Sequence, residues 1–149
     1  MSDPDAGDPA SDPWPDVLEW LHVAESDQRV VRLCLTADPP LRDAATFHCQ
    51  QAAEKLLKGF LVQAGVHVRK THDLDALAEL VLHRFPTLDA LLTPLRSWTS
   101  WSVAYRYPGE AGLEPEPSVE ELSQALDVIA QLDAALRSLA PPAPDAGNP

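Results

Sequence analysis

Residues 41–64, LRDAATFHCQQAAEKLLKGFLVQA, decide the fold of this chain. The stretch contains no proline, and its apolar side chains recur every three or four residues: Ala45, Cys49, Ala52, Leu56, Phe60 and Ala64. That spacing is typical of one face of an α-helix. Gly65 follows directly, and glycine commonly ends helices because it adopts a left-handed backbone conformation at little cost. We therefore expect a helix over residues 41–64.

The same helical spacing occurs on both sides of this stretch. It covers residues 16–37, 74–85, 88–105 and 118–139, and no strand candidate of useful length is present. The fold class predicted is therefore all-α: a single domain, built as an up-and-down bundle of about five helices with short connections.

Individual residues predict where these helices begin and end. Pro39-Pro40 ends the first segment, because proline cannot continue a helix. Asp73 is expected to cap the helix over 74–85, and Ser118 with Glu121 matches the capping box that opens a helix. Pro94 lies inside the 88–105 segment, so we expect a kink or a late helix start there.

Proline and acidic residues are concentrated towards the ends of the chain. The net charge is −12, from 23 acidic and 11 basic side chains, and there are 15 prolines. Residues 1–15 hold four prolines and four aspartates, and residues 140–149 hold four more prolines. Both segments are expected to be disordered tails, because they lack the apolar residues that would offset the entropy of ordering. Residues 16–139 are left as the helical domain.

The central part of the chain is nearly neutral. Residues 16–109 contain 11 acidic and 10 basic side chains, and residues 55–70 hold four bases and no acid. The acidic total disfavours general binding to phosphate backbones, which requires basic patches. It does not exclude a small nucleotide site or an RNA site in the central region.

The sequence is typical of a soluble cytoplasmic protein. Cys34 and Cys49 are too few for a disulfide framework. The N-terminus lacks the basic and apolar regions of a secretory signal, and no apolar run is long enough to cross a bilayer. We expect reduced thiols and no membrane association.

A polar stripe on the helix over 41–64 is the first candidate site. His48, Gln51, Lys55 and Lys58 are spaced three, four and three residues apart, so a helix places them along one side. Imidazole, amide and ammonium groups together could bind an anion or a phosphate. A solvated helix face or a polar interface with another subunit would give the same pattern, and the spacing leaves these alternatives open.

Two further segments could bind a ligand. Lys70-Thr71-His72 precedes a helix N-terminus, where basic residues can hold anions, although a simple capping loop would have the same sequence. Residues 98–109 contain Tyr105-Arg106-Tyr107, which could stack on a base. Trp98 and Trp101 in the same segment are more typical of a helix end that packs into the core.

Three motifs, in this order, resemble the HEPN domain family (higher eukaryotes and prokaryotes nucleotide-binding). They are His48-x-Gln50-Gln51-Ala52-x-Glu54-Lys55-x-x-Lys58, Lys70-Thr71-His72-Asp73-Leu74 and Tyr105-Arg106-Tyr107-Pro108. The resemblance covers about residues 16–135 and implies a helical bundle that is usually a homodimer. Prokaryotic members are often encoded beside a minimal nucleotidyltransferase. Many such pairs behave as toxin and antitoxin, with the HEPN partner an RNA-cleaving toxin.

The ribonuclease motif of the catalytic HEPN proteins is incomplete in this sequence. Those proteins resemble one another in an Arg-x(4–6)-His motif, in which the histidine moves a proton and the arginine stabilises charge on phosphorus. Arg106 is in a suitable place for the arginine, but residues 111–113 read Ala-Gly-Leu and no histidine follows His83. The resemblance therefore implies a member without the usual centre, with His48 and Arg106 as the candidates for a divergent one.

Three functions are therefore considered. The first is a nucleotide-binding or partner module associated with a nucleotidyltransferase. Its nucleotide- or anion-binding residues would be His48, Gln51, Lys55, Lys58, Lys70, His72, Arg106 and Tyr107. The second is a metal-independent ribonuclease toxin with a divergent centre, and the third is a helical dimerisation unit without a ligand. We expect neither a metal nor a cofactor, because no ligand spacing for zinc and no glycine-rich nucleotide motif is present.

Overall fold

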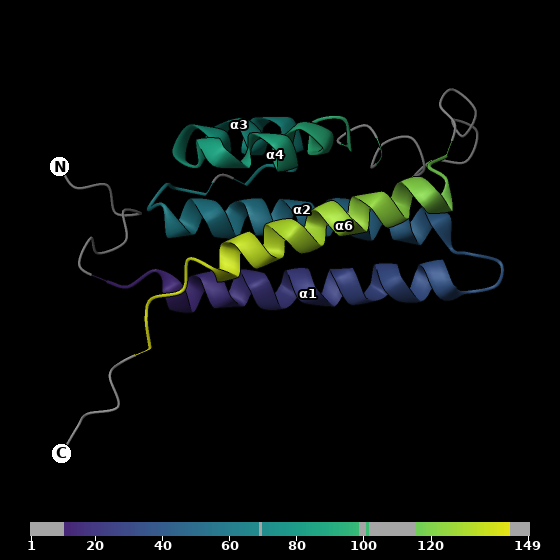
Figure 1. Cartoon of the computed structure of the whole chain (residues 1–149), viewed down its shortest axis with the longest axis horizontal. Helices are drawn as coiled ribbons and strands as arrows, with labels where there is room; N and C mark the ends of the chain where they lie inside the picture. The colour runs from purple at the N-terminus through teal and green to yellow at the C-terminus, as the bar shows by residue number, and fades with distance from the viewer. Residues whose placement is uncertain (1–10, 69, 99–100, 102–115, 144–149) are drawn as a thin grey trace, which may run out of the picture.

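A computed structural model describes residues 11–68, 70–98, 101 and 116–143. In these residues the chain forms α1 (Trp14–Thr36), α2 (Arg42–Gln63), α3 (Leu74–Arg84), α4 (Asp89–Leu95) and α6 (Val119–Arg137). A 3₁₀ turn at Pro86–Leu88 precedes α4, and the described residues contain no strand. The predicted all-α, single-domain helical bundle is confirmed (Figure 1).

The central helix of the bundle is α2, which contacts α1, α3 and α6. Figure 1 shows α1 and α2 side by side and antiparallel, joined by a short turn, with α6 crossing them and α3 and α4 on the far side of α2. The start of α6 lies beside the start of α2, where Arg42 Nη2 is 2.9 Å from Glu116 Oε2. The end of α6 lies beside the end of α2, so these two helices run parallel.

The apolar stripe that predicted α2 forms the centre of the core. Five of its six members are no more than 1 % exposed, and Ala64, the residue that ends the helix, is half-buried. Gly59 on the same helix allows its neighbours to approach closely. A Cβ atom at Gly59 would lie 2.7 Å from Leu136 Cδ2 on α6 and 3.4 Å from Trp20 Cβ on α1. The missing side chain therefore lets α1, α2 and α6 meet at one point.

The predicted helix ends are present in the structure. The Asp73 carboxylate accepts hydrogen bonds from the backbone N–H groups of Asp75 and Ala76, at 3.0 and 3.2 Å. The Ser118 hydroxyl accepts one from the N–H of Glu121 at 3.1 Å. Gly65 has a φ of 70°, in the left-handed region that favours glycine.

Two boundaries differ from the prediction. First, α1 begins at Trp14, two residues before the expected start of the helical domain, since Pro15 lies in the first turn where no N–H is needed. Second, the single segment expected over 88–105 is divided, and α4 ends at Leu95, directly after Pro94. Proline has no N–H to donate to the preceding turn, and the helix closes with a tighter bond from the N–H of Arg96 to the carbonyl of Thr93. Most of the segment beyond Trp98 lies outside the described residues.

None of the helices in the described ranges has both the length and the apolar character needed to cross a bilayer. The two cysteines are free thiols inside the protein, Cys34 on α1 and Cys49 on α2. Burial raises the pKa of Cys49 from 9.0 to about 12, with a smaller contribution from the neighbouring Cys34. The Cys49 thiol is therefore protonated at neutral pH and behaves as a small apolar side chain.

This pKa predicts that the protein loses stability in alkali. The unfolded chain releases the Cys49 proton above about pH 9, whereas the folded chain keeps it until about pH 12. The contribution of this thiol to the free energy of unfolding is therefore fully present below about pH 9. It falls by up to about 1.4 kcal/mol per pH unit as the pH rises from about 9 to about 12. Urea unfolding at a series of pH values measures the effect. The variant Cys49→Ala should show a shallower decline, and identical pH dependence in both proteins would contradict the prediction.

Candidate functional site

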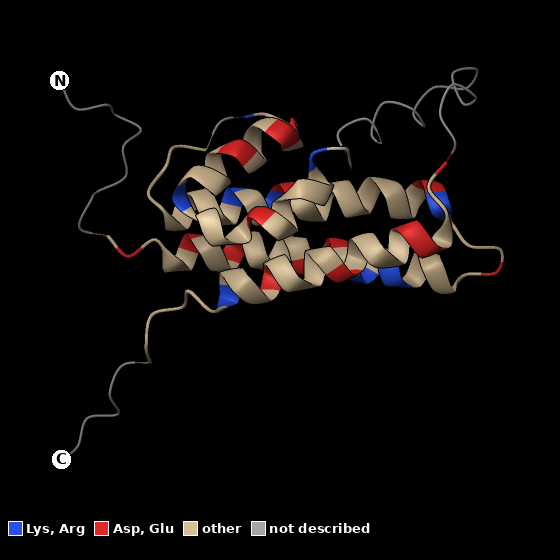
Figure 2. Cartoon of the chain, turned by 45° about the horizontal axis from the view of Figure 1, so that its top comes forward, with Lys and Arg blue, Asp and Glu red and all other residues tan. Residues whose placement is uncertain are grey.

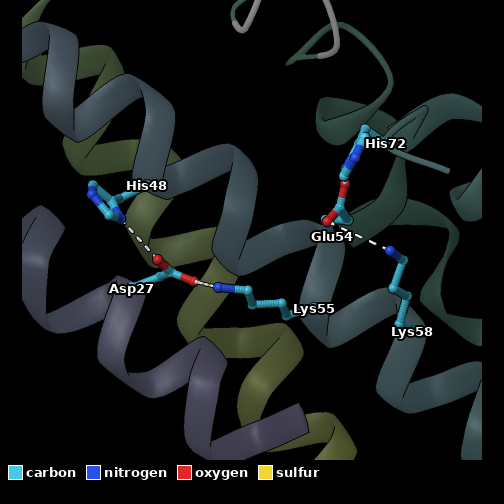
Figure 3. Close-up of polar contacts among 6 residues, drawn as sticks. All are labelled: Asp27, His48, Glu54, Lys55, Lys58 and His72. Atoms are coloured by element: carbon cyan, nitrogen blue, oxygen red, sulfur yellow. Dashed lines mark hydrogen bonds and ion pairs between the residues drawn. The ribbon is translucent and has the colours of Figure 1, made fainter. Parts of the chain in front are cut away.

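Asp27 lies on the face of α1 that packs against α2. It is 6 % exposed, and the buried residues Ala24 and Val31 lie one turn before and after it. Its carboxylate binds two side chains of α2: Oδ1 is 2.8 Å from His48 Nδ1, and Oδ2 is 2.5 Å from Lys55 Nζ. Figure 3 shows Asp27 between these two partners. The Asp27 cluster, defined as Asp27, His48 and Lys55, thus connects α1 to α2 by charged hydrogen bonds.

The geometry of the Asp27 cluster determines which nitrogen of His48 carries a proton. An ionised carboxylate only accepts hydrogen bonds, so Nδ1 must donate. Nε2 is then left outside this contact. The side chains of His48 and Lys55 are 29 % and 25 % exposed, against 9 % for Asp27. The carboxylate of the cluster is therefore buried, whereas the side chains of His48 and Lys55, which form its polar rim, are partly exposed to water.

A second carboxylate, Glu54, lies on α2 itself. It is 5 % exposed, and its Oε1 is 2.6 Å from Nδ1 of His72, in the loop before α3. Its Oε2 is 3.6 Å from Nζ of Lys58, one turn further along α2. Nζ of Lys58 also lies 5.8 Å from the centre of the Trp20 ring on α1, within the range of a cation–π contact. The Glu54 cluster (Glu54, Lys58 and His72) thus joins three parts of the bundle.

The structure divides the polar stripe predicted on α2. His48 and Lys55 belong to the Asp27 cluster, with the half-buried Gln51 between them along the helix. Lys58 belongs to the Glu54 cluster and is only 8 % exposed, so the interpretation as a solvated helix face is wrong for this residue. The four side chains therefore lie in two separate surroundings, and each ammonium group already has a carboxylate partner.

The other predicted site residues are distributed as follows. Lys70 is exposed, and the side chain of His72 is 83 % exposed although its Nδ1 binds Glu54. Arg106 and Tyr107 lie outside the described residues. Trp98 is 4 % exposed and stacks on Trp101, with ring centres 5.2 Å apart, which confirms the core interpretation for Trp98.

Sequence reasoning missed Asp27 altogether and gave Glu54 no role. Asp27 lies on the apolar stripe of α1, three residues after Ala24 and four before Val31. Because side chains at this spacing share one face of a helix, the carboxylate of Asp27 is buried together with them. A buried charge must be paired. This position could therefore have indicated an ion pair, although not its partners. No group of three metal-ligating side chains is found among the described residues.

Comparison with known families identifies the family of the chain. The family model described as HEPN domain matches residues 17–137, which is most of the chain. The chain belongs to the HEPN domain family. Searches of curated proteins and of solved structures found no match.

Removing Asp27 should destabilise the protein more than removing an exposed acid of similar geometry. Asp27→Ala leaves two partly buried nitrogen groups without their acceptor, so we expect a loss of about 2 kcal/mol or more in the free energy of unfolding. Asp75 binds Arg96 at 3.2 Å, but its side chain is 58 % exposed, so it is the matched control. Asp75→Ala should cost less than about 1 kcal/mol. Urea unfolding of the two variants makes the comparison, and equal losses would show that burial adds nothing to the Asp27 contacts.

Proposed function

We propose that this chain is a HEPN-domain binding module that acts with a minimal nucleotidyltransferase in a toxin–antitoxin-like pair of a prokaryotic cytoplasm. In this proposal it is a homodimer, it binds a nucleotide, and it lacks the usual arginine–histidine ribonuclease centre. Membership of the HEPN family is the starting point. The partner, the dimer and the ligand are the parts that experiments have to test.

The pairing of the α2 cations is the observation that carries this proposal. Lys55 is bound to Asp27, and Lys58 is bound to Glu54, so each ammonium group lies against a buried carboxylate. A phosphate backbone entering this region would meet those carboxylates as well as the cations. Figure 2 shows acidic and basic residues interspersed along the helices of the described part of the chain. This distribution favours a small ligand or a protein partner over a long RNA.

The missing histidine supports a non-catalytic role. The arginine–histidine mechanism needs an imidazole a few residues after the arginine, and no histidine follows His83 in the sequence. The one arginine that precedes a histidine at the family's spacing is Arg42, six residues before His48. Arg42 binds Glu116 at 2.9 Å, whereas His48 binds Asp27. The contacts of these two side chains therefore give no support to a shared catalytic centre.

Incubation of the purified protein with RNA in the presence of EDTA tests the non-catalytic role. We expect the RNA to stay intact, because no arginine–histidine pair is available to transfer a proton and stabilise the phosphorane. Samples of the purification host without the protein control for contaminating nuclease. Cleavage by the wild-type protein, lost in Arg106→Ala or His48→Ala, would contradict this role.

Cleavage that is lost in Arg106→Ala or His48→Ala would support a second candidate function, a metal-independent ribonuclease with a divergent centre. The contact between Asp27 and His48 is the observation that favours it, because a carboxylate on Nδ1 orients an imidazole so that Nε2 can accept a proton. No described arginine lies in this cluster to stabilise the charge that develops on phosphorus. The binding module is therefore the better supported of the two.

Nucleotide binding and partnership need separate measurements. A ligand that binds only the folded protein raises its melting temperature, so at least one nucleotide of a panel should raise Tm. A uniform lack of response would contradict nucleotide binding and leave the protein partner to be tested. To test the partnership, the chain is purified from its own cells. A nucleotidyltransferase should copurify with it in a fixed molar ratio and be identified by mass spectrometry. Light scattering of the purified chain measures the dimer.

A further inference from the structure

The Asp27 cluster differs from an ordinary phosphate site in its charge. The Asp27 carboxylate offsets the charge of the Lys55 ammonium group, so Lys55 is not an unpaired cation. The Glu54 cluster has the same balance between Glu54 and Lys58. Phosphate sites in proteins usually combine unpaired cations with the N–H groups of a helix N-terminus. His48 and Lys55 lie within the body of α2, away from its N-terminus at Arg42, and therefore have neither feature.

We infer that the Asp27 cluster, together with Gln51, binds the uncharged nucleoside part of a nucleotide and not its phosphates. This inference rests on the proposed nucleotide binding and names the part of the ligand that the site takes. The sequence prediction gave the same residues of α2 as nucleotide- or anion-binding and did not say which part of a nucleotide they contact. Asp27, which the sequence reasoning overlooked, is the residue that changes the chemistry.

The hydrogen-bonding groups at the rim of the cluster are suited to a neutral ligand. Because Nδ1 of His48 donates to Asp27, Nε2 is an acceptor when the ring is neutral. Lys55 uses one of its three N–H donors on Asp27 and has two more. The amide of Gln51, half-buried between them along α2, can both donate and accept. Ribose hydroxyls and base edges also present donors and acceptors together, whereas a phosphate presents only acceptors.

The residues around the Asp27 cluster also favour a nucleoside over a phosphate. Val23 and Val30 lie one turn before and after Asp27 on α1; Val23 is 38 % exposed and Val30 is half-buried. They add apolar surface beside the polar rim, a combination that is common where proteins bind small organic ligands. Figure 3 shows the Asp27 cluster between α1 and α2, with α6 behind these helices. A phosphate bound here would lie close to the Asp27 carboxylate and be repelled by it.

Comparing nucleosides with their triphosphates tests the inference on the intact chain. Isothermal titration is carried out at about pH 8, where imidazole contributes little charge, with adenosine, guanosine, cytidine and uridine and with each triphosphate. The tightest nucleoside and its triphosphate should bind within about threefold of each other. Raising the salt from about 50 to 200 mM should change either affinity by less than about twofold, because recognition by charge would be strongly salt-dependent.

Two results overturn the inference in different ways. Triphosphate binding that is more than about tenfold tighter than nucleoside binding, and that weakens with salt, would show that the phosphates are recognised; the proposed nucleotide binding would then stand without this inference. No binding of any nucleoside or triphosphate would overturn both.

Variants then place the ligand on the structure. Gln51→Ala leaves every ion pair of the Asp27 cluster intact, so it should weaken nucleoside binding by about tenfold, the effect of roughly one lost hydrogen bond, without unfolding the protein. His48→Ala should weaken binding at least as much. His83→Ala removes an exposed histidine on α3 and is the matched control, expected to bind as the wild type does. Unchanged binding in both Gln51→Ala and His48→Ala would place the ligand elsewhere and overturn the inference.

Discussion

The contact of Asp27 with two side chains of α2 is the interaction on which the arrangement of this bundle depends. A central helix is buried on several sides. A charged side chain on its buried part is therefore paired inside the protein, because burying an unpaired charge costs much free energy. α2 carries His48, Lys55 and Lys58, and their partners come from α1 and from α2 itself. Asp27 therefore joins α1 to α2, and Glu54 joins the loop before α3 to the same helix. Apolar packing supplies most of the stability, and in this arrangement of the helices each of these charges lies beside a partner.

The same contacts change the chemistry that α2 can perform. Ammonium groups along a helix suggest a site for anions when the helix is considered alone. In the folded protein each of these groups lies against a carboxylate, so neither Lys55 nor Lys58 is an unpaired cation. Membership of the HEPN family does not by itself distinguish a ribonuclease from a binding partner. The buried carboxylates are the feature of this chain that favours the binding role, because they oppose the approach of a phosphate backbone.

Much of the fold could be predicted because it depends on local physics. The apolar stripe of α2, the caps at Asp73 and Ser118 and the glycine at residue 65 were all expected, and the structure contains them. Each of these features involves residues within one or two turns of one another. The prediction was less accurate around Pro94, where a proline near the end of a helix and one in its middle leave similar patterns in the sequence. The candidate site was predicted in part: His48 and Lys55 do lie together, but Lys58 lies in a different cluster.

The helical class of this protein can be inferred from the sequence alone, and so can the buried face of its central helix, several of its helix ends and its likeness to the HEPN family. These features follow from the period of the helix and from backbone chemistry, which act over a few residues. The pairing of the charged side chains, in contrast, depends on how the helices pack. Asp27 lies 21 residues before His48, and Glu54 lies 18 residues before His72, so no local pattern connects either pair. Both contacts exist because separate segments of the chain pack against α2, and burial then requires each charge to be paired.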